Sequence, residues 1–168
     1  MMYKNVDEVL RDIYRFGALR IEPLNNTAQV CQWIENKGVS GSKSSLTQAE
    51  WHANAAMIQS RIERVLNRFE LAVVECEYGA VDLHNIVDLT VFIEQENKGV
   101  NLLICDDLLS HIFCGMRQEA IQDKYDLSRK TIYNQKKKVK DIVSALLNSA
   151  ICKLEDDFLL SGVIQKVA

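Results

Sequence analysis

Six cationic side chains lie within residues 129–140, near the C-terminal end of the chain, and no acidic residue lies among them. They are Arg129, Lys130, Lys136, Lys137, Lys138 and Lys140. The whole chain carries a net charge of −3, so this segment carries +6 and the remainder carries −9. A polyanion responds to local charge density, so the overall negative charge does not exclude it as a partner. The chemistry that this segment indicates is binding of a phosphate backbone.

Side chains that distinguish bases lie in the same segment. Arginine forms two hydrogen bonds with guanine and asparagine forms two with adenine, and each such pair discriminates by about 1–3 kcal/mol. On a helix, the residues predicted to face away from Ile132 and toward base edges are Arg129, Lys130, Tyr133 and Asn134. The lysines suited to phosphates, because a flexible ammonium group positions without reading sequence, are Lys136, Lys137, Lys138 and Lys140. We therefore predict sequence-specific binding to double-stranded DNA.

The elements that must position these side chains are a short helix, a tight turn and a long helix, all within Gly115–Lys140. Ser128 is the predicted N-cap of the long helix, since a serine hydroxyl accepts hydrogen bonds from amides at a helix start. Asp126 stands where a turn often has glycine, and aspartate tolerates the left-handed conformation. Gln122 stands where the common pattern has a small residue, so its long side chain must lie outside the contact between the helices or widen their crossing angle. The apolar residues fall where a helix-turn-helix needs them, at Ile121, Tyr125, Leu127 and Ile132.

The rest of the chain also has helical spacing and contains a single proline, Pro23, so we predict an all-α fold. The expected architecture is a helical bundle with a C-terminal helix-turn-helix and a long basic recognition helix. The segments expected before that motif are a helix from Val6 that ends before Pro23, a helix over 27–35, one helix from the capping box at Thr47–Glu50 to Tyr78 with Gly79 as its cap, a helix from Asp82 that closes by Gly99, and a helix capped by Asp106 or Asp107 and stopped by Gly115.

A Gly- and Ser-rich segment over 36–45 divides the chain into residues 1–45 and a helical core over 46–168, with the helix-turn-helix at about 106–155. The segment either tethers an N-terminal subdomain or is a loop on a single domain. The apolar stripe of the last helix continues from Ile132 to Leu154. A stripe of that length needs a cover, which is either the helix beginning near residue 48 or a second copy in a homodimer.

Other chemistry finds little support in the sequence. The three histidines have no partners at metal-ligand or triad spacing, and no phosphate-binding glycine loop is present. The five cysteines are scattered without a paired motif, so we predict no metal, no cofactor and no enzymatic activity. No apolar run approaches the roughly 20 residues that span a bilayer, and the N-terminal residues lack a signal-peptide apolar region. We expect a cytoplasmic protein without a membrane partner.

The C-terminal half resembles the late antitermination (Q-type) proteins of lambdoid phages, particularly those without a zinc ribbon. The residues that carry the resemblance are Leu108-Leu109, Gly115-Met116, the run from Leu127 to Ile132 and the lysine-rich helix to about Leu147, with Arg15–Arg20 similar to a segment near the start of such proteins. The helix-turn-helix also resembles region 4 of bacterial sigma factors. The resemblance implies a protein that binds DNA near a late promoter, joins bacterial RNA polymerase with its sigma factor, and lets it read through terminators.

Two other functions remain open at this point. A phage terminase small subunit would also recognise DNA, but it would assemble into a stable ring. A protein-interaction module would use the basic helix on an acidic partner and would have no affinity for DNA.

Overall fold

The computed structural model describes residues 3–18, 48–96 and 99–165, and these residues form an all-α fold, as predicted. They contain seven α-helices and one 3-10 turn, and their only strand-like pairing is an isolated bridge between Tyr3 and Ile164. None of the helices described has both the length and the apolarity needed to cross a membrane. The helix predicted over 27–35, the Gly/Ser segment over 36–45 and Thr47 of the predicted capping box lie outside the described residues.

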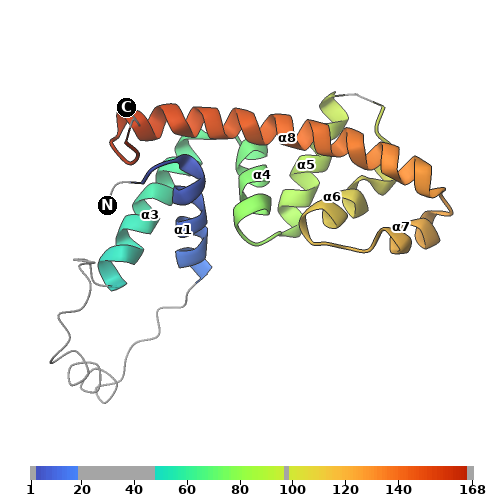
Figure 1. Ribbon diagram of the computed structural model, residues 1–168, viewed down its shortest axis with the longest axis horizontal. Coiled ribbons are helices and arrows are strands. Elements are labelled where there is room, and N and C mark those ends of the chain that lie inside the picture. The colour runs from blue at the N-terminus through green and yellow to red at the C-terminus, as the bar shows by residue number, and fades with distance from the viewer. Residues whose placement is uncertain (1–2, 19–47, 97–98, 166–168) are drawn as a thin grey trace, which may run out of the picture.

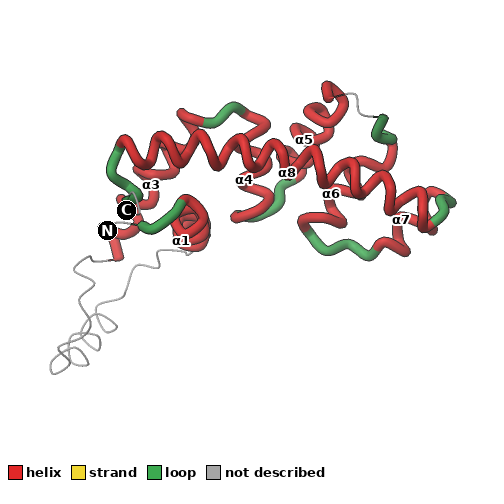
Figure 2. The backbone as a smooth tube through the Cα atoms, turned by 45° about the horizontal axis from the view of Figure 1, so that its top comes forward, coloured by secondary structure: helices red, strands yellow, loops and turns green. Residues whose placement is uncertain are grey.

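The longest element, α8, extends along the whole molecule, and the other helices pack beneath it (Figure 1). Its 32 residues correspond to about 48 Å at 1.5 Å per residue. In both Figure 1 and Figure 2, α1 and α3 lie at its C-terminal end, α4 and α5 near its middle, and α6 and α7 at its N-terminal end. The helices are α1 (Val6–Ala18), α3 (Gln48–Val65), α4 (Arg68–Tyr78), α5 (Leu83–Glu96), α6 (Cys105–Phe113), α7 (Gln118–Tyr125) and α8 (Arg129–Leu160), with the 3-10 turn at Leu102–Ile104.

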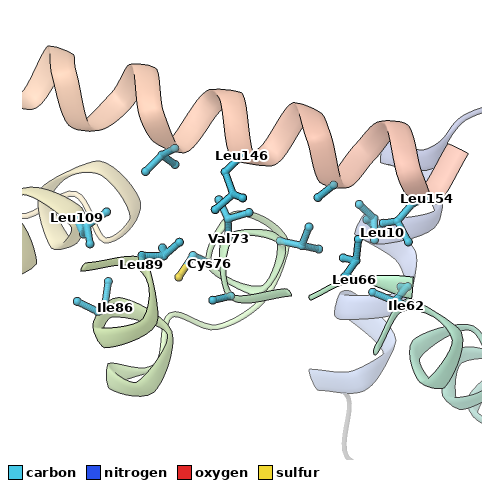
Figure 3. Close-up of a cluster of buried hydrophobic side chains, with 14 of the residues drawn as sticks. Leu10, Ile62, Leu66, Val73, Cys76, Ile86, Leu89, Leu109, Leu146 and Leu154 are labelled. Atoms are coloured by element: carbon cyan, nitrogen blue, oxygen red, sulfur yellow. The ribbon is translucent and has the colours of Figure 1, made fainter. Parts of the chain in front are cut away.

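The core lies along one apolar stripe of α8. Figure 3 shows Leu146 and Leu154 of α8 pointing toward the shorter helices, where Val73 of α4 and Leu10 of α1 meet them. The stripe is buried from end to end by helices of the same chain, α3 among them, and the N-terminal α1 belongs to the same core. The buried residues of α8 recur at helical spacing and are Ile132, Val139, Ile142, Val143, Leu146, Ala150, Leu154 and Phe158.

The single helix predicted from Thr47 to Tyr78 is wrong, because the chain breaks at Asn67 into α3 and α4. Asn67 has extended backbone angles, and its side chain accepts hydrogen bonds from the amides of Phe69 (3.0 Å) and Glu70 (2.9 Å). Glu70 in turn accepts from the Asn67 amide at 3.1 Å, which completes a capping box. Gly79 caps the far end of α4 as predicted, and its amide donates to the Glu75 carbonyl at 2.9 Å.

The predicted cap of α6 is also wrong. The helix follows the 3-10 turn directly, so Ile104 occupies the N-cap position and provides no side-chain hydrogen bond. Asp106 and Asp107 lie in the first turn instead. Asp106 accepts a hydrogen bond from Thr90 of α5 at 2.5 Å, and Asp107 accepts one from Lys124 of α7 at 2.7 Å. The two carboxylates therefore connect α6 to α5 and to α7. The contact with Lys124 helps to hold the short helix α7 beside α8.

Candidate nucleic-acid interface

The turn between α7 and α8 consists of three residues. Asp126 has φ 50° and ψ 44°, in the left-handed region, and no other non-glycine residue in the described ranges has a positive φ. Ser128 returns to extended angles, and its hydroxyl accepts a hydrogen bond from the Thr131 amide at 3.2 Å. This is the N-cap predicted for Ser128, and it makes Arg129 the first residue of α8.

Apolar contact holds α7 against α8 at the turn. Ile121 of α7 and Ile132 of α8 are fully buried, and Tyr125 and Leu127 are partly buried beside them. The Lys124–Asp107 ion pair adds a polar connection to α6. Partial burial acts to raise the pKa of Asp107, but hydrogen bonds from Lys124 and Tyr125 hold the pKa of this carboxyl below its ordinary value. The three helices α6, α7 and α8 thus contact one another at the right-hand end of Figure 1.

Four exposed side chains form the outward face of the first turns of α8. They follow one another at helical spacing, on the side opposite the buried Ile132. Tyr133 leaves 62% of its surface exposed, which is unusual for a large aromatic side chain without a partner. Asp141 follows one turn after the last of them and ends the basic face. We call these four residues, Lys130, Tyr133, Asn134 and Lys137, the outward face.

Arg129 lies at the edge of this face, next to α7. It lines a small hollow of about 80 Å³ together with Gln118, Glu119 and Gln122 of α7. Gln122 is partly buried at the hollow, so it lies outside the apolar contact that Ile121 and Ile132 make. On the other side of the outward face, a groove of about 510 Å³ runs along α8 and gives access to Asn134. Arg129 and Asn134, the candidates for recognition of guanine and adenine, are therefore both accessible.

Two of the predicted phosphate-binding lysines are bound to the rest of the protein. The ammonium of Lys136 lies 2.8 Å from Nε2 of His111, and Lys138 donates to the Gly99 carbonyl at 3.0 Å. The Asn101 amide donates to Gln135 at 3.1 Å and strengthens the second connection. The remaining cations are exposed, and within the described part of the chain their side chains form no hydrogen bond or ion pair; they are Arg129, Lys130, Lys137 and Lys140.

The charges at the start of α8 oppose its dipole. The first turn of α8 holds Arg129 and Lys130 and no acidic residue. By contrast, α1, α3, α4, α6 and α7 each have an acidic residue in the first turn. An anion near a helix N-terminus is stabilised by about 0.3–1 kcal/mol through the helix dipole, and a cation there is disfavoured. The arrangement therefore weakens the helix and strengthens the attraction of the same place for an anion.

Sequence reasoning missed the residues that hold the lysines. The three histidines were predicted only to lack partners at metal-ligand or triad spacing, and nothing in the sequence relates His111 to Lys136, which is 25 residues away. Gly99 was predicted only to close a helix and no prediction was made for Asn101, yet they contact Lys138 and Gln135 of α8. Contacts over such separations depend on how the helices pack, so no local sequence pattern predicts them.

Comparison with known proteins gives no family for the chain. No protein-family model matches it, and no curated protein sequence matches it. Inference about function therefore depends on the geometry and charge of the residues described above.

Proposed function

We propose that this protein binds double-stranded DNA through the N-terminal half of α8 and regulates transcription. The α7–turn–α8 unit acts as a helix-turn-helix, in which α7 supports and α8 enters the major groove. The segment that carries the six cations, 129–140, is about 18 Å long at 1.5 Å per residue, a length that suits contact with a few base pairs. The acidic remainder of the molecule disfavours other orientations on DNA.

The observation that carries the proposal is the set of unpaired cations at the start of α8. Arg129, Lys130, Lys137 and Lys140 are exposed, and the described residues provide them with no carboxylate partner. The first two also stand where the helix dipole disfavours positive charge. An exposed face of a stable helix normally alternates its charges, so this arrangement supports an external anion as the missing partner.

The outward face divides into two roles. Asn134 has the side chain that pairs with adenine through two hydrogen bonds, and Tyr133 offers an aromatic ring beside it. Lys130 and Lys137 stand one turn on either side of this pair and suit the phosphates that border a groove. Arg129, beside α7, is the candidate for guanine recognition at the edge of the site.

Within this proposal, antitermination is the most specific role. It is supported by the resemblance of residues 108–147 to phage Q-type proteins, with bacterial RNA polymerase as the second partner. A transcription assay tests it directly. The protein is added to polymerase that transcribes from a promoter carrying the selected DNA site toward a terminator, and increased read-through is expected. Unchanged read-through with tight DNA binding would leave a regulator of initiation in place of an antiterminator.

DNA binding itself is tested with a random duplex over a series of salt concentrations. Four free cations that neutralise about four phosphates give a slope near −4 in log affinity against log salt. A Lys130→Glu/Lys137→Glu variant should lose binding. A Lys4→Glu/Arg64→Glu variant changes the net charge equally at two exposed positions outside α8, and it should bind like the unmodified protein.

Several outcomes would contradict the proposal. If the affinity for DNA does not change with salt, the start of α8 is excluded as the contact. The same follows if both double variants lose affinity equally. No binding even at low salt would favour a protein-interaction module. A stable ring-like oligomer with DNA affinity, measured by light scattering, would favour a terminase small subunit.

A further inference from the structure

Tyr133, on the outward face of α8, is the aromatic side chain that the fold leaves in solvent. It leaves 62% of its surface exposed, whereas every other aromatic side chain whose surroundings the structure describes is at least partly buried. Among the described residues its hydroxyl forms no hydrogen bond, and its ring contacts no other ring and no cation. Tyr125 of α7, by contrast, packs against the core and has the ammonium of Lys124 over its ring. Tyr133 therefore contributes little to the fold.

The buried side of α8 fixes the direction in which this ring points. Ile132, directly before it, is fully buried, so the helix cannot rotate about its axis without exposing that residue. At 3.6 residues per turn, Tyr133 is turned by about 100° from Ile132, which brings it to the outward face beside Asn134. Lys130 and Lys137 lie about one turn before and after it on the same face. A duplex whose phosphates these two lysines bind therefore meets the ring and the amide between them.

The major groove of a duplex offers such a ring few partners. Only the edges of the bases are accessible there, and their groups are hydrogen-bond donors and acceptors, with the 5-methyl group of thymine as the exception. The phosphates that border the groove are charged and suit lysines. Contact between an exposed ring and a methyl group is favourable, because it removes apolar surface of both from water. Thymine is therefore the base whose chemistry matches Tyr133.

The neighbour of Tyr133 points to the same kind of base pair. Asn134 suits the adenine of an A·T pair. The Cα atoms of consecutive residues lie about 3.8 Å apart and successive base pairs about 3.4 Å apart, so the two side chains reach the same base pair or adjacent ones. We propose that Tyr133 recognises the 5-methyl group of a thymine by apolar contact and, with Asn134, gives the DNA site its A·T pairs, an inference that rests on the proposed function.

Replacement of thymine by uracil tests the inference, because it removes the 5-methyl group and leaves base pairing unchanged. The duplex that the unmodified full-length protein selects from a random pool is labelled with a fluorophore and titrated with each of its thymines replaced in turn. Loss of the contact with one methyl group should weaken binding about three- to fivefold at the position that Tyr133 reads. Tyr133→Ala should bind the thymine and uracil duplexes equally, about as tightly as the unmodified protein binds the uracil duplex.

Two further variants separate the ring from its surroundings. Tyr133→Phe keeps the ring and removes the hydroxyl, so it should keep the full difference between thymine and uracil. Lys137→Ala should weaken binding to both duplexes alike and keep the ratio of their affinities, since a phosphate contact does not depend on the base. Tyr133 and Lys137 are both exposed, so these substitutions should leave the fold intact, and circular dichroism checks each variant.

Salt-sensitive binding to duplex DNA that no uracil replacement changes would overturn this inference and leave the proposed function intact. The inference is also overturned if the selected site contains no thymine, or if Tyr133→Ala keeps the full effect of uracil. An equal loss of affinity for every duplex in Tyr133→Phe would assign the hydroxyl to the backbone and overturn it as well. Tighter binding to the single strand than to the duplex would do the same, because it would assign the ring to stacking on unpaired bases. No binding to any DNA would remove the proposed function, and the recognition of thymine with it.

Discussion

The hydroxyl of Ser128 accepts a hydrogen bond from the amide of Thr131 at 3.2 Å, and it lies 2.9 Å from the Thr131 hydroxyl. This relationship fixes where α8 begins, because the N-cap satisfies an amide that the helix itself leaves without a partner. It also places Arg129 and Lys130 in the first turn, where their charges oppose the helix dipole. One small side chain therefore serves the stability of α8 and the position of its exposed cations.

Substitution of Ser128 should separate these two effects. Ser128→Ala removes the cap and should lower the free energy of unfolding by about 1 kcal/mol. Ser128→Asp keeps an acceptor and adds a charge that the dipole favours, so stability should be kept or should rise. The same carboxylate would repel phosphates and should weaken DNA binding. Urea unfolding and DNA titration of both variants check this, and parallel losses of stability and binding in Ser128→Asp would contradict it.

Substitutions on the outward face and at its edge should separate recognition of sequence from attraction to phosphates. Asn134→Ala removes an adenine-pairing group and should relax the sequence preference, with a loss of about 1–3 kcal/mol on the preferred site only. Arg129→Ala should relax the preference in the same way at a guanine. Lys137→Ala should weaken binding to every duplex about equally and reduce the salt slope by about 1. Selection from a random duplex pool followed by titration measures both effects. If all three variants weaken binding to every DNA sequence equally, the assignment of the base-recognising residues is wrong.

The left-handed residue in the turn provides a test of the local backbone. Asp126 has φ 50°, a conformation that glycine adopts without cost and that β-branched residues strongly disfavour. Asp126→Gly should leave the free energy of unfolding nearly unchanged, whereas Asp126→Val should lower it by about 1–2 kcal/mol. Thermal unfolding of the two variants measures the difference. Equal stabilities would mean that the turn adopts another conformation in solution.

The sequence was sufficient for features that depend on neighbouring residues. The turn could be predicted because Leu127 and Ser128 follow a helical pattern within a few positions, and the apolar wedge of Ile121 and Ile132 has a fixed spacing. The break at Asn67 was missed although Asn67 and Glu70 form a capping box. The apolar register continues through that point, with Leu66 and Ala72 buried on either side, so periodicity alone indicates one helix.

Contacts between helices were beyond the reach of local patterns. Asp106 and Asp107 have the residue type and position of a helix cap, yet both are engaged by α5 and α7. A carboxylate at a helix start has both options, and only the packing of the neighbouring helices decides between them. The same is true of Lys136, whose sequence neighbours are all cationic or polar and whose partner is on another helix. The basic segment was visible in the sequence, but the division into bound and free lysines was not.

The buried carboxylate of Glu70 should make stability depend on pH in the acid range. Glu70 is 2% exposed, and it accepts hydrogen bonds from Lys153 (2.6 Å) and Ser149 (3.2 Å) of α8 and from the Asn67 amide. Burial acts to raise its pKa, but hydrogen bonds from Lys153, Asn67 and Ser149 hold the pKa below its ordinary value. The ionised form is therefore favoured in the folded state. This contribution to stability is present above the pKa of the unfolded chain, about 4.3, and is lost as the pH falls through the lower folded value.

Glu70→Gln should consequently remove part of the acid sensitivity. At neutral pH the variant should be less stable by about 1–3 kcal/mol, because an amide cannot replace the charged partner of Lys153. Between about pH 5 and pH 3 the unmodified protein should lose stability more steeply than the variant, since only the former has this carboxylate to protonate. Glu155→Gln, at an exposed position on α8, serves as the control and should follow the unmodified protein. Urea unfolding midpoints across this pH range measure the slopes. Identical slopes for Glu70→Gln and the unmodified protein would show that the contact between α4 and α8 does not depend on the charge of Glu70.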